Sequence, residues 1–361
     1  MKTIAYYISD YGYGHATRSL AIIRQLLKKN NDIKIIICNS YALEYMRAVL
    51  EKENLAFFRN VTTDIGYVLK SQSMDIDIEI MKIKYQKYLK QWDYLIEQEK
   101  FFIQENKVDF IISDITPIPF EVAFKLGIPS LGISNFTWFT AYQDVIEKQL
   151  LEPFKGAYNK MTYYFKLAGS KEPNWANKEN RKYEFFSREI DWDEVNRIKN
   201  LIGHTNGNRH VIYFGLGMKV DIGSLDDLPL WDSPNCIFIV SSNVTVNKPN
   251  VYTIPHDYLE TQNFIAASDL VISKAGWSTV TEAVCARKPL LLLDRQNMKE
   301  DQNTISFLKK HHLCKTITWQ DLKEFKINED FMRKVTDEYI SKAKIFQNKV
   351  EDIAENILEL I

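Results

Sequence analysis

The chain has 361 residues, of which 45% are hydrophobic and 26% are charged. This composition excludes a disordered protein, and the chain is too long for one compact core, so we expect two domains. Its 46 basic and 47 acidic residues give a formal charge of −1, which argues against nucleic acid or an anionic membrane as the main partner. The four cysteines form no CxxC pair and indicate reduced thiols. No long apolar segment or leader is visible, so we expect a cytoplasmic protein without a transmembrane segment.

The first half of the chain alternates short apolar runs with helical patterns. A helix is predicted after the first run and over residues 119–126, and one or two amphipathic helices over residues 80–105. Strands that alternate with helices indicate a parallel sheet covered on both faces. We therefore predict a first Rossmann-like domain over residues 1–155. The runs predicted as its strands are residues 3–8, 33–38, 108–113 and 130–134.

A change of pattern near residue 155 predicts a second domain. Residues 156–208 carry many charges and aromatic side chains but no clean buried strand, so we predict a crossover region there. The alternation then restarts and predicts a doubly wound α/β domain over residues 209–339. A helix over residues 340–358 has one apolar face, so the segment 340–361 is expected to pack back on the first domain. The strands predicted in the second domain are residues 210–214, 237–241, 251–254, 269–273 and 290–293.

The first candidate motif is YGYGHATR, residues 11–18, which opens the first helix directly after the first strand. It is not the dinucleotide fingerprint, because Thr17 replaces the third glycine and no acidic residue ends the second strand. His15 is either a catalytic base or a cap of the helix, and its ordinary pKa of about 6.5 suits proton abstraction at neutral pH. Asp10 and Asp114 are the competing bases.

The second motif is SKAGWSTVTEA, residues 273–283, which joins a predicted strand to a predicted helix. Gly276 lets the backbone bend sharply, and Ser278 and Thr279 open a helix whose N–H groups suit a diphosphate. Glu282 lies about one turn inside this helix. Its carboxylate either accepts hydrogen bonds from the vicinal diol of a ribose or is a favourable charge near the helix start.

Polar residues also follow three other predicted strands. Asp114 follows one of them and either caps the next helix or faces the glycine motif. Asn135 and Trp138 follow the next strand, and Trp138 either packs in the core or stacks on a sugar. Asp301 and Gln302 follow the strand 290–293. All five lie at carboxyl ends of strands, which is the edge where α/β proteins bind ligands.

At these residues the chain resembles a GT-B glycosyltransferase, a fold of two Rossmann-like domains that face each other across a cleft. The segment DLVISKAGWSTVTEAVCARKPLLLL, residues 269–293, is similar to the nucleotide-binding strand, glycine loop and helix of glycosyltransferase family 28. The segments YGYGHATR and SDITPIPFEVAFKLGIPSLGISNFTW, the latter over residues 113–138, resemble the glycosyltransferase-like N-terminal region of plant L-arabinokinases.

The resemblance implies a role for each motif. Glu282 would hold the ribose, and His15 would lie near the acceptor. The loop FGLGMK, residues 214–219, departs from the family's glycine-rich loop. We predict His15 and Asp114 as the catalytic residues. The resemblance implies donor contacts for Gly276, Ser278, Thr279, Glu282, Asp301 and Gln302, and we add Gly14, Gly215 and Gly217 as predicted donor-binding residues. The residues predicted to bind the acceptor are Tyr13, Arg18, Asn135 and Trp138.

The implied function is the transfer of a sugar, with inversion, from a nucleoside diphosphate donor such as a UDP-sugar to a hydroxyl of a small-molecule or glycan acceptor. The sequence shows no cluster with metal-ligand spacing, and helix N-termini can stabilise a diphosphate, so we expect neither a metal nor a cofactor. Two alternatives stay open on the same fold. One is hydrolysis or epimerisation of a nucleotide-sugar, and the other is non-catalytic binding.

Overall fold

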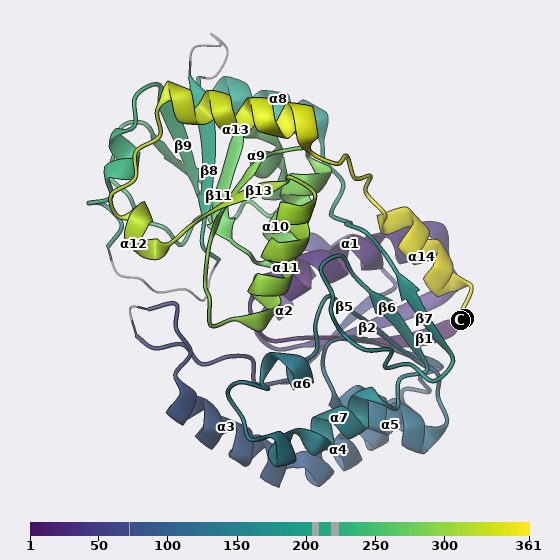
Figure 1. The fold of residues 1–361 in the computed structure, drawn as a ribbon. Helices are drawn as coiled ribbons and strands as arrows, with labels where there is room; N and C mark the ends of the chain where they lie inside the picture. Colours follow the sequence, from purple (N-terminus) through teal and green to yellow (C-terminus); the bar gives the residue numbers. More distant parts are fainter. Residues whose placement is uncertain (72, 204–208, 218–223) are drawn as a thin grey trace. The chain divides into compact units, whose positions relative to one another are not determined.

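The computed structural model describes residues 1–71, 73–203, 209–217 and 224–361, which form two compact units. Each unit contains a parallel sheet with helices on both faces (Figure 1). This architecture confirms the α/β class expected from the alternating sequence pattern. Unit 1 comprises Met1–Lys70, Asp75–Glu184 and Lys349–Ile361, and unit 2 comprises Ser71–Met74 and Phe185–Asn348.

The described strands of unit 1 form a seven-stranded parallel sheet in the order β3-β2-β1-β4-β5-β6-β7. β2 reads IKIIICN and is almost entirely buried, because helices cover both faces of a parallel sheet. Strands β1, β2, β4 and β5 confirm the four predicted runs. The strands are β1 (Lys2–Ile8), β2 (Ile33–Asn39), β3 (Ala56–Asn60), β4 (Phe110–Asp114), β5 (Ser130–Ser134), β6 (Tyr163–Lys166) and β7 (Glu179–Lys182).

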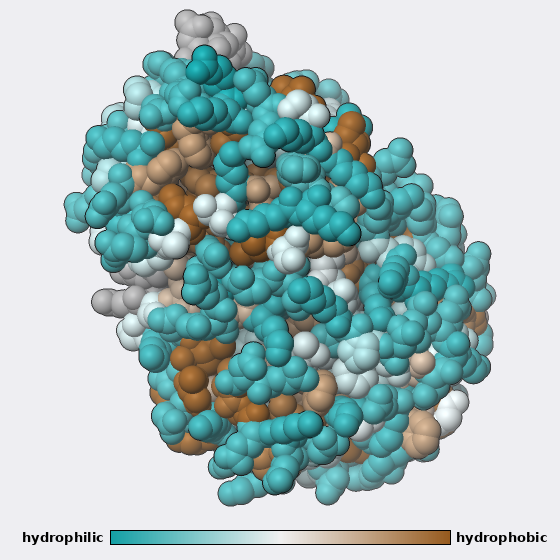
Figure 2. All heavy atoms as spheres, in the orientation of Figure 1, coloured by the Kyte–Doolittle hydropathy of each residue, from teal (hydrophilic) through white to brown (hydrophobic). Residues whose placement is uncertain are grey.

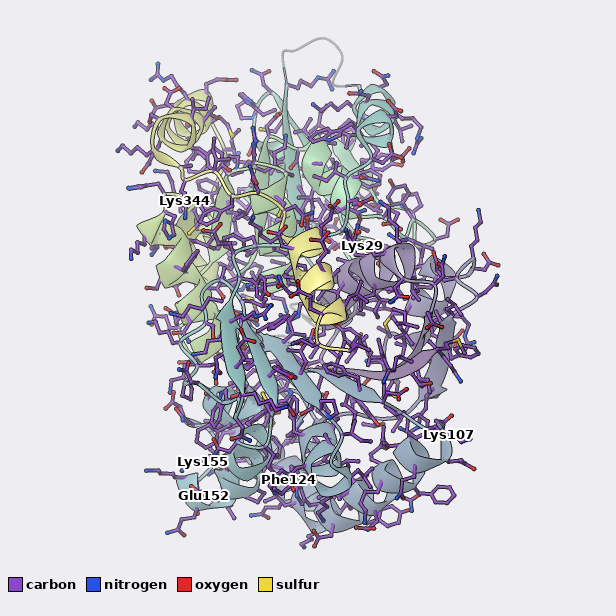
Figure 3. The ribbon with its side chains drawn as sticks, turned by 90° about the vertical axis from the view of Figure 1, so that its right-hand side faces the viewer. Lys29, Lys107, Phe124, Glu152, Lys155 and Lys344 are labelled. Carbon is purple, nitrogen blue, oxygen red and sulfur yellow. The ribbon has the colours of Figure 1, made fainter. Side chains whose placement is uncertain are left out.

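The helices of unit 1 lie in two layers, with α1 and α14 on one face of the sheet and α4, α5 and α7 on the other (Figure 1). α14 buries Ile353 and Ile357, and an ion pair of 2.7 Å joins Lys29 Nζ of α1 to Glu355 Oε1 of α14. Lys29 is labelled beside α14 in Figure 3. The described helices are α1 (Tyr13–Lys29), α2 (Leu43–Val49), α3 (Ile78–Lys90), α4 (Trp92–Glu105), α5 (Ile118–Leu126), α6 (Trp138–Ala141), η1 (Lys148–Leu151), α7 (Glu152–Tyr158) and α14 (Val350–Leu358).

The described strands of unit 2 form a six-stranded parallel sheet in the order β10-β9-β8-β11-β12-β13. All five strands predicted for this half are present, and β13 is an addition at the edge. β12 reads LLLL and is fully buried, as expected for a strand with both faces covered. The strands are β8 (His210–Gly215), β9 (Cys236–Val240), β10 (Val251–Thr253), β11 (Leu270–Lys274), β12 (Leu290–Leu293) and β13 (Cys314–Ile317).

The core of unit 2 is built around Trp231, which is 1% exposed. Its ring packs edge-on against Phe214 of β8 and Phe238 of β9, at centroid distances of 5.2 and 5.1 Å. Leu322 and Met332 close this core from the following helices. The described helices are α8 (Trp192–Leu201), η3 (Pro229–Asp232), α9 (Gln262–Ala267), α10 (Trp277–Cys285), α11 (Lys299–Lys310), α12 (Trp319–Leu322) and α13 (Glu329–Lys342).

Two predicted segments differ from the structure. The crossover region 156–208 was predicted to lack a buried strand, but it contributes β6 and β7 to the sheet of unit 1. The helix predicted over residues 340–358 is broken, because α13 ends at Lys342 and α14 begins at Val350. Both errors have the same physical reason, which is the lack of a periodic signal in the sequence. Four-residue strands are too short to show a period, and the helix is interrupted at residues that include neither glycine nor proline.

Hydrophilic residues cover most of the face drawn in Figure 2, with smaller hydrophobic patches between them. Among the described residues, no helix combines the length and the apolar character that crossing a bilayer requires.

Candidate functional site

The first candidate site lies where the chain order of the unit 1 sheet reverses, between β1 and β4. The loop after β1 turns at Gly12, whose φ of 86° lies in the region that favours glycine. Helix α1 begins directly afterwards at Tyr13. Gly14 and His15 therefore lie in the first turn of α1, at the carboxyl end of β1, where ligands bind in open α/β sheets.

The structure brings His15 and Asp114 together although 99 residues separate them in the chain. His15 Nδ1 lies 3.0 Å from Asp114 Oδ1, and the two side chains are 8% and 1% exposed. β1 and β4 are adjacent in the sheet, so the loop after β1 and the last residue of β4 meet at one edge. His15 and Asp114, which the sequence offers as competing bases, therefore form a hydrogen-bonded pair.

Arg18, one turn further along α1, determines which nitrogen of His15 carries the proton. Its Nε donates to Asp114 Oδ2 at 2.6 Å, and one terminal nitrogen, NH2, donates to Asp114 Oδ1 and to Ser134 Oγ. That terminal nitrogen also lies 2.9 Å from His15 Nδ1, but its two hydrogens already have acceptors. We therefore assign the Nδ1 proton to His15, which donates it to Asp114 and carries its lone pair on Nε2.

The charge of Asp114 is maintained by this network. Burial alone would raise the pKa of the Asp114 carboxyl, but the Arg18 and His15 side chains lower the pKa to about 2. Asp114 is therefore a carboxylate at every pH near neutrality. A buried carboxylate on Nδ1 stabilises an imidazolium, so the pair has the arrangement that a histidine base needs.

Asp10, the competing base from the sequence, has a structural role instead. Its carboxylate accepts four hydrogen bonds, from the backbone N–H groups of Ser40, Tyr41 and Thr63 and from Ser40 Oγ, at 2.8 to 3.0 Å. It therefore ties together the loops that follow β1, β2 and β3.

Asp64 is a titratable group that the sequence reasoning missed. It is 3% exposed and accepts hydrogen bonds from Trp138 Nε1 at 2.8 Å and from the Asp10 backbone N–H at 3.3 Å. Burial, and then the charge of Asp10, raise the pKa of Asp64 to about 7. No motif in the sequence marks this residue, because its environment comes from segments that are distant in the chain.

We predict that the stability advantage of the wild type over an Asp64→Asn variant decreases as pH rises from about 4 to 7. The folded-state pKa of Asp64, about 7, exceeds the ordinary value of 3.8, so the folded state keeps a proton that the unfolded chain has already lost. The advantage should change by a few kcal/mol, since one pKa unit corresponds to about 1.36 kcal/mol. Urea unfolding across this pH range measures it. Asp93→Asn, at an exposed carboxyl, is the control, and a pH-independent advantage for both variants would contradict the prediction.

Three of the residues predicted to bind the acceptor lie inside unit 1 instead. Trp138 is fully buried and stacks on Tyr142 with ring centroids 5.0 Å apart, so of its two predicted roles core packing is confirmed and stacking on a sugar is wrong. Arg18 and Asn135 are also buried and bond to each other at 2.9 Å; they support Asp114. Tyr13 remains a candidate for acceptor binding, because its side chain is only partly buried.

Tyr13 belongs to a group of three tyrosines beside the glycine loop. Its ring lies edge-on to Tyr41 and Tyr45, with centroids 5.5 and 5.3 Å apart. Tyr41 is 41% exposed. Half-exposed aromatic rings with hydroxyl groups suit a sugar or another ring-containing acceptor.

The second candidate site lies at the corresponding edge of the unit 2 sheet, between β8 and β11. Ser273 of β11 pairs with Gly215 of β8 and donates a side-chain hydrogen bond of 2.6 Å to its carbonyl. The two predicted glycine loops, at Gly215 and Gly217 and at Gly276, therefore follow neighbouring strands. Gly217 has a φ of 81°, which favours glycine. Residues 218 and 219 of the FGLGMK loop lie outside the described residues.

Helix α10 begins at Trp277, and the preceding Gly276 provides no side-chain cap. Ser278 and Thr279 lie in its first turn, as predicted. The first N–H groups of an α-helix have no partner within the helix and favour an anion. These residues therefore form an edge that suits a diphosphate.

Lys274, at the end of β11, was quoted within the motif but was not singled out. Its Cε lies 3.0 Å from where a Cβ on Gly217 would stand and 3.4 Å from where one on Gly276 would stand. The lysine therefore runs between the two glycine loops and places a cation at the candidate diphosphate edge. A lysine directly after a predicted strand and two residues before a glycine was the signal available in the sequence.

Glu282 lies in α10 as predicted, but its carboxylate is paired with Arg188. Two nitrogens of Arg188 donate to Glu282 Oε1 at 2.8 and 3.0 Å. Burial raises the pKa of the Glu282 carboxyl, and Arg188 opposes that rise. No pattern in the sequence indicates Arg188, which lies 94 residues earlier.

Asp301 and Gln302 stabilise the loop after β12. Asp301 is 2% exposed and accepts a hydrogen bond of 2.7 Å from Arg295, so its predicted contact with the donor sugar is not supported. Gln302 donates to Asp294 Oδ1 at 2.7 Å and is only partly buried. Gln302 therefore remains a candidate, and Asp301 does not.

The comparisons with known proteins agree with this geometry. Residues 241–357 match the glycosyltransferase family 28 C-terminal domain. This range contains the Gly276 loop, helix α10 and Glu282, so the candidate diphosphate edge lies within the family 28 domain. The resemblance predicted from the residues around Gly276 is confirmed.

Two further proteins are similar to most of the chain. L-arabinokinase of Arabidopsis thaliana is 23% identical over 306 residues, which cover 82% of this chain and 28% of that protein. The chain thus spans about a quarter of the curated relative. UGT89C1 of Arabidopsis thaliana, solved with UDP, has a TM-score of 0.61 at 10% identity and covers 99% of this chain and 95% of that one.

A third protein with a similar structure is an epimerase by its name. The UDP-GlcNAc 2-epimerase of Neisseria meningitidis, bound to UDP-GlcNAc, has a TM-score of 0.59 at 14% identity, with 100% of both chains covered. Likenesses at these identities show the fold. They confirm the GT-B fold, and together with the family 28 domain they support a glycosyltransferase.

Proposed function

We propose that this protein transfers a sugar, with inversion, from a nucleoside diphosphate donor held by unit 2 to an acceptor hydroxyl that His15 of unit 1 deprotonates. The observation that carries the proposal is the buried His15–Asp114 pair at 3.0 Å, in a chain whose other half contains a family 28 domain. A uridine nucleotide is favoured by UDP and UDP-GlcNAc in the similar structures.

In the proposed reaction, the acceptor oxygen attacks the anomeric carbon while His15 Nε2 takes the hydroxyl proton. The new bond forms as the bond between the anomeric carbon and the diphosphate oxygen breaks, and the nucleoside diphosphate leaves with the electron pair. Asp114 stabilises the imidazolium through Nδ1. A single displacement of this kind inverts the anomeric configuration.

The leaving group needs charge stabilisation as its bond breaks. The first N–H groups of α10, at Trp277 and Ser278, and the ammonium of Lys274 can supply it. A small-molecule or glycan acceptor would lie near Tyr13, and a cytoplasmic location is part of this proposal.

A thermal-shift screen of the full chain with nucleoside diphosphates and nucleotide-sugars tests the donor class. A ligand at 100 times its Kd stabilises a protein by about 2.7 kcal/mol, which gives a measurable rise in Tm. We expect UDP and at least one UDP-sugar to raise the Tm. No response to any nucleotide in the screen would refute the proposed donor class.

We predict that Lys274→Met weakens UDP binding about tenfold or more, because a charge-assisted hydrogen bond contributes about 1.5–3 kcal/mol. Binding of uridine, which lacks the diphosphate, should change little. Titration calorimetry with both ligands measures the difference. Lys310→Met, on the exposed face of α11, is the control, and equal losses for UDP and uridine would show that Lys274 does not act on the diphosphate.

Epimerisation is the second candidate function, because an epimerase shares the fold over its full length. It predicts an isomerised nucleotide-sugar in the absence of any acceptor. Glycosyl transfer predicts no isomerised nucleotide-sugar under the same condition.

A further inference from the structure

A buried ion pair in unit 2 joins two segments that are far apart in the sequence. The side chains of Arg188 and Glu282 are 1% and 7% exposed. Arg188 donates from two of its nitrogens, and both hydrogen bonds end on Oε1 of Glu282. In the described part of the chain, the hydrogen bonds to this carboxylate thus converge on one of its two oxygens.

The guanidinium of Arg188 is also held from its other side. It donates to the carbonyl of Leu259 at 2.9 Å and to Thr261 Oγ1 at 3.1 Å, and Glu260 Oε2 lies 3.7 Å away. Arg188 therefore bridges the segment that precedes α9 and helix α10. A planar guanidinium held at this many points has a defined orientation.

The backbone that carries Arg188 is itself fixed to unit 2. Thr281 Oγ1 of α10 donates to the Phe186 carbonyl at 2.6 Å. The side chain of Asn348 accepts from the Ser187 N–H at 3.1 Å and donates to the Ser187 carbonyl at 3.0 Å. Arg188 is thus placed against Glu282 by its neighbours as well as by its own contacts.

We propose that Arg188 is a positioning residue for the donor nucleotide: it holds Glu282 through Oε1 so that Oε2 is presented to the ribose diol. The proposal rests on the proposed function, in which unit 2 binds a nucleoside diphosphate. A buried carboxylate without this partner is unfavourable in its charged form. Glu282 would then be protonated or would rotate, and in either state it would be a poorer acceptor for two hydroxyl groups.

The role proposed for Arg188 can be tested by comparing the binding of nucleotides with and without the ribose 2′-hydroxyl. A lost hydrogen bond to a charged group corresponds to a change in affinity of about tenfold or more. Wild-type protein should therefore bind UDP about tenfold more tightly than 2′-deoxy-UDP. The ratio of the two Kd values isolates the 2′-hydroxyl of the diol, because both ligands share the base, the diphosphate and the 3′-hydroxyl.

Titration calorimetry on the full-length variants Glu282→Gln, Arg188→Met and Arg188→Lys tests the proposal. We expect the Kd ratio to fall to about 1–2 in all three variants, because the 2′-hydroxyl loses its positioned, charged acceptor in each of them. Lysine retains the charge but lacks the fork that grips Oε1, and it is the milder variant if Arg188→Met fails to fold. Thr281→Val is the matched control, because it loosens the same segment without touching the ion pair. It should lower the Tm and leave the ratio at about tenfold.

The outcomes separate this proposal from the function on which it rests. An Arg188 variant that folds and keeps the wild-type ratio, while Glu282→Gln loses it, would overturn the positioning role alone. A wild-type ratio of about one would remove the diol contact of Glu282, and with it the role of Arg188, but not the donor class. If ADP or GDP binds in place of UDP, the matching ribose and deoxyribose pair is used. Failure of every nucleoside diphosphate to bind would overturn the proposed function and this proposal together.

Discussion

The His15→Ala variant should lose a factor of about 10²–10⁴ in kcat while its affinity for the donor nucleotide stays close to the wild-type value. The expected loss is the usual contribution of a general base, because the variant has no group to take the acceptor proton. The donor is proposed to bind in unit 2, so its Kd should not depend on a side chain of unit 1. Initial rates of nucleoside diphosphate release and titration calorimetry give the two values.

A second histidine provides the control for this measurement. His256 is exposed in unit 2, and His256→Ala should keep the wild-type kcat. Loss of acceptor affinity with an unchanged kcat in His15→Ala would show that His15 only positions the acceptor. Asp114 would then be the remaining candidate, although its low pKa makes it a weak base.

The Asp114→Asn variant should be the least stable single variant at this site, with a loss of roughly 3–5 kcal/mol in the free energy of unfolding. The substitution leaves the guanidinium of Arg18 buried without its carboxylate, and Arg18 is 5% exposed. It also removes the acceptor of the His15 Nδ1 proton, so kcat should fall with stability. Urea unfolding at neutral pH measures the first effect.

The pH dependence of this loss follows from the pKa of Asp114. The folded-state pKa, about 2, is below the ordinary value of 3.8. The stabilisation is therefore present above about pH 4 and is lost as pH falls toward 2. The wild type and Asp114→Asn should converge in stability over that acidic range.

A double variant controls for the buried charge. The double variant Arg18→Met, Asp114→Leu removes both members of the Arg18–Asp114 ion pair. It should recover much of the stability that Asp114→Asn loses. Its kcat should stay low, because His15 still lacks an acceptor for Nδ1–H. An Asp114→Asn protein as stable as the wild type would show that the pair does not support unit 1.

The parts of the fold that could be predicted are those with a local signal. The runs at β2 and β12 are almost entirely apolar, as expected for strands buried on both faces. The glycines before α1 and α10 indicated the two turns, and the motif order then placed His15 and Gly276 at the ligand-binding edges of their sheets. Because β1 and β4 are neighbours in the sheet, His15 and Asp114 lie at the same edge.

The parts that could not be predicted depend on contacts between distant segments. Nothing near Glu282 in the sequence indicates Arg188, and Asp64 has no motif. Trp138 follows a strand end, so the sequence left both core packing and acceptor binding open, and the surrounding tyrosines bury it. Residue type and spacing cannot distinguish a side chain that faces a ligand from one that faces the core.

The most direct test of the central claim is to follow the anomeric proton of a UDP-sugar by NMR in the presence of the full-length protein, with and without acceptor. We predict a glycoside of opposite anomeric configuration together with free UDP, in the presence of acceptor only, and neither product with His15→Ala. Free sugar or an isomerised nucleotide-sugar formed without acceptor would contradict glycosyl transfer and establish a hydrolase or an epimerase on this fold.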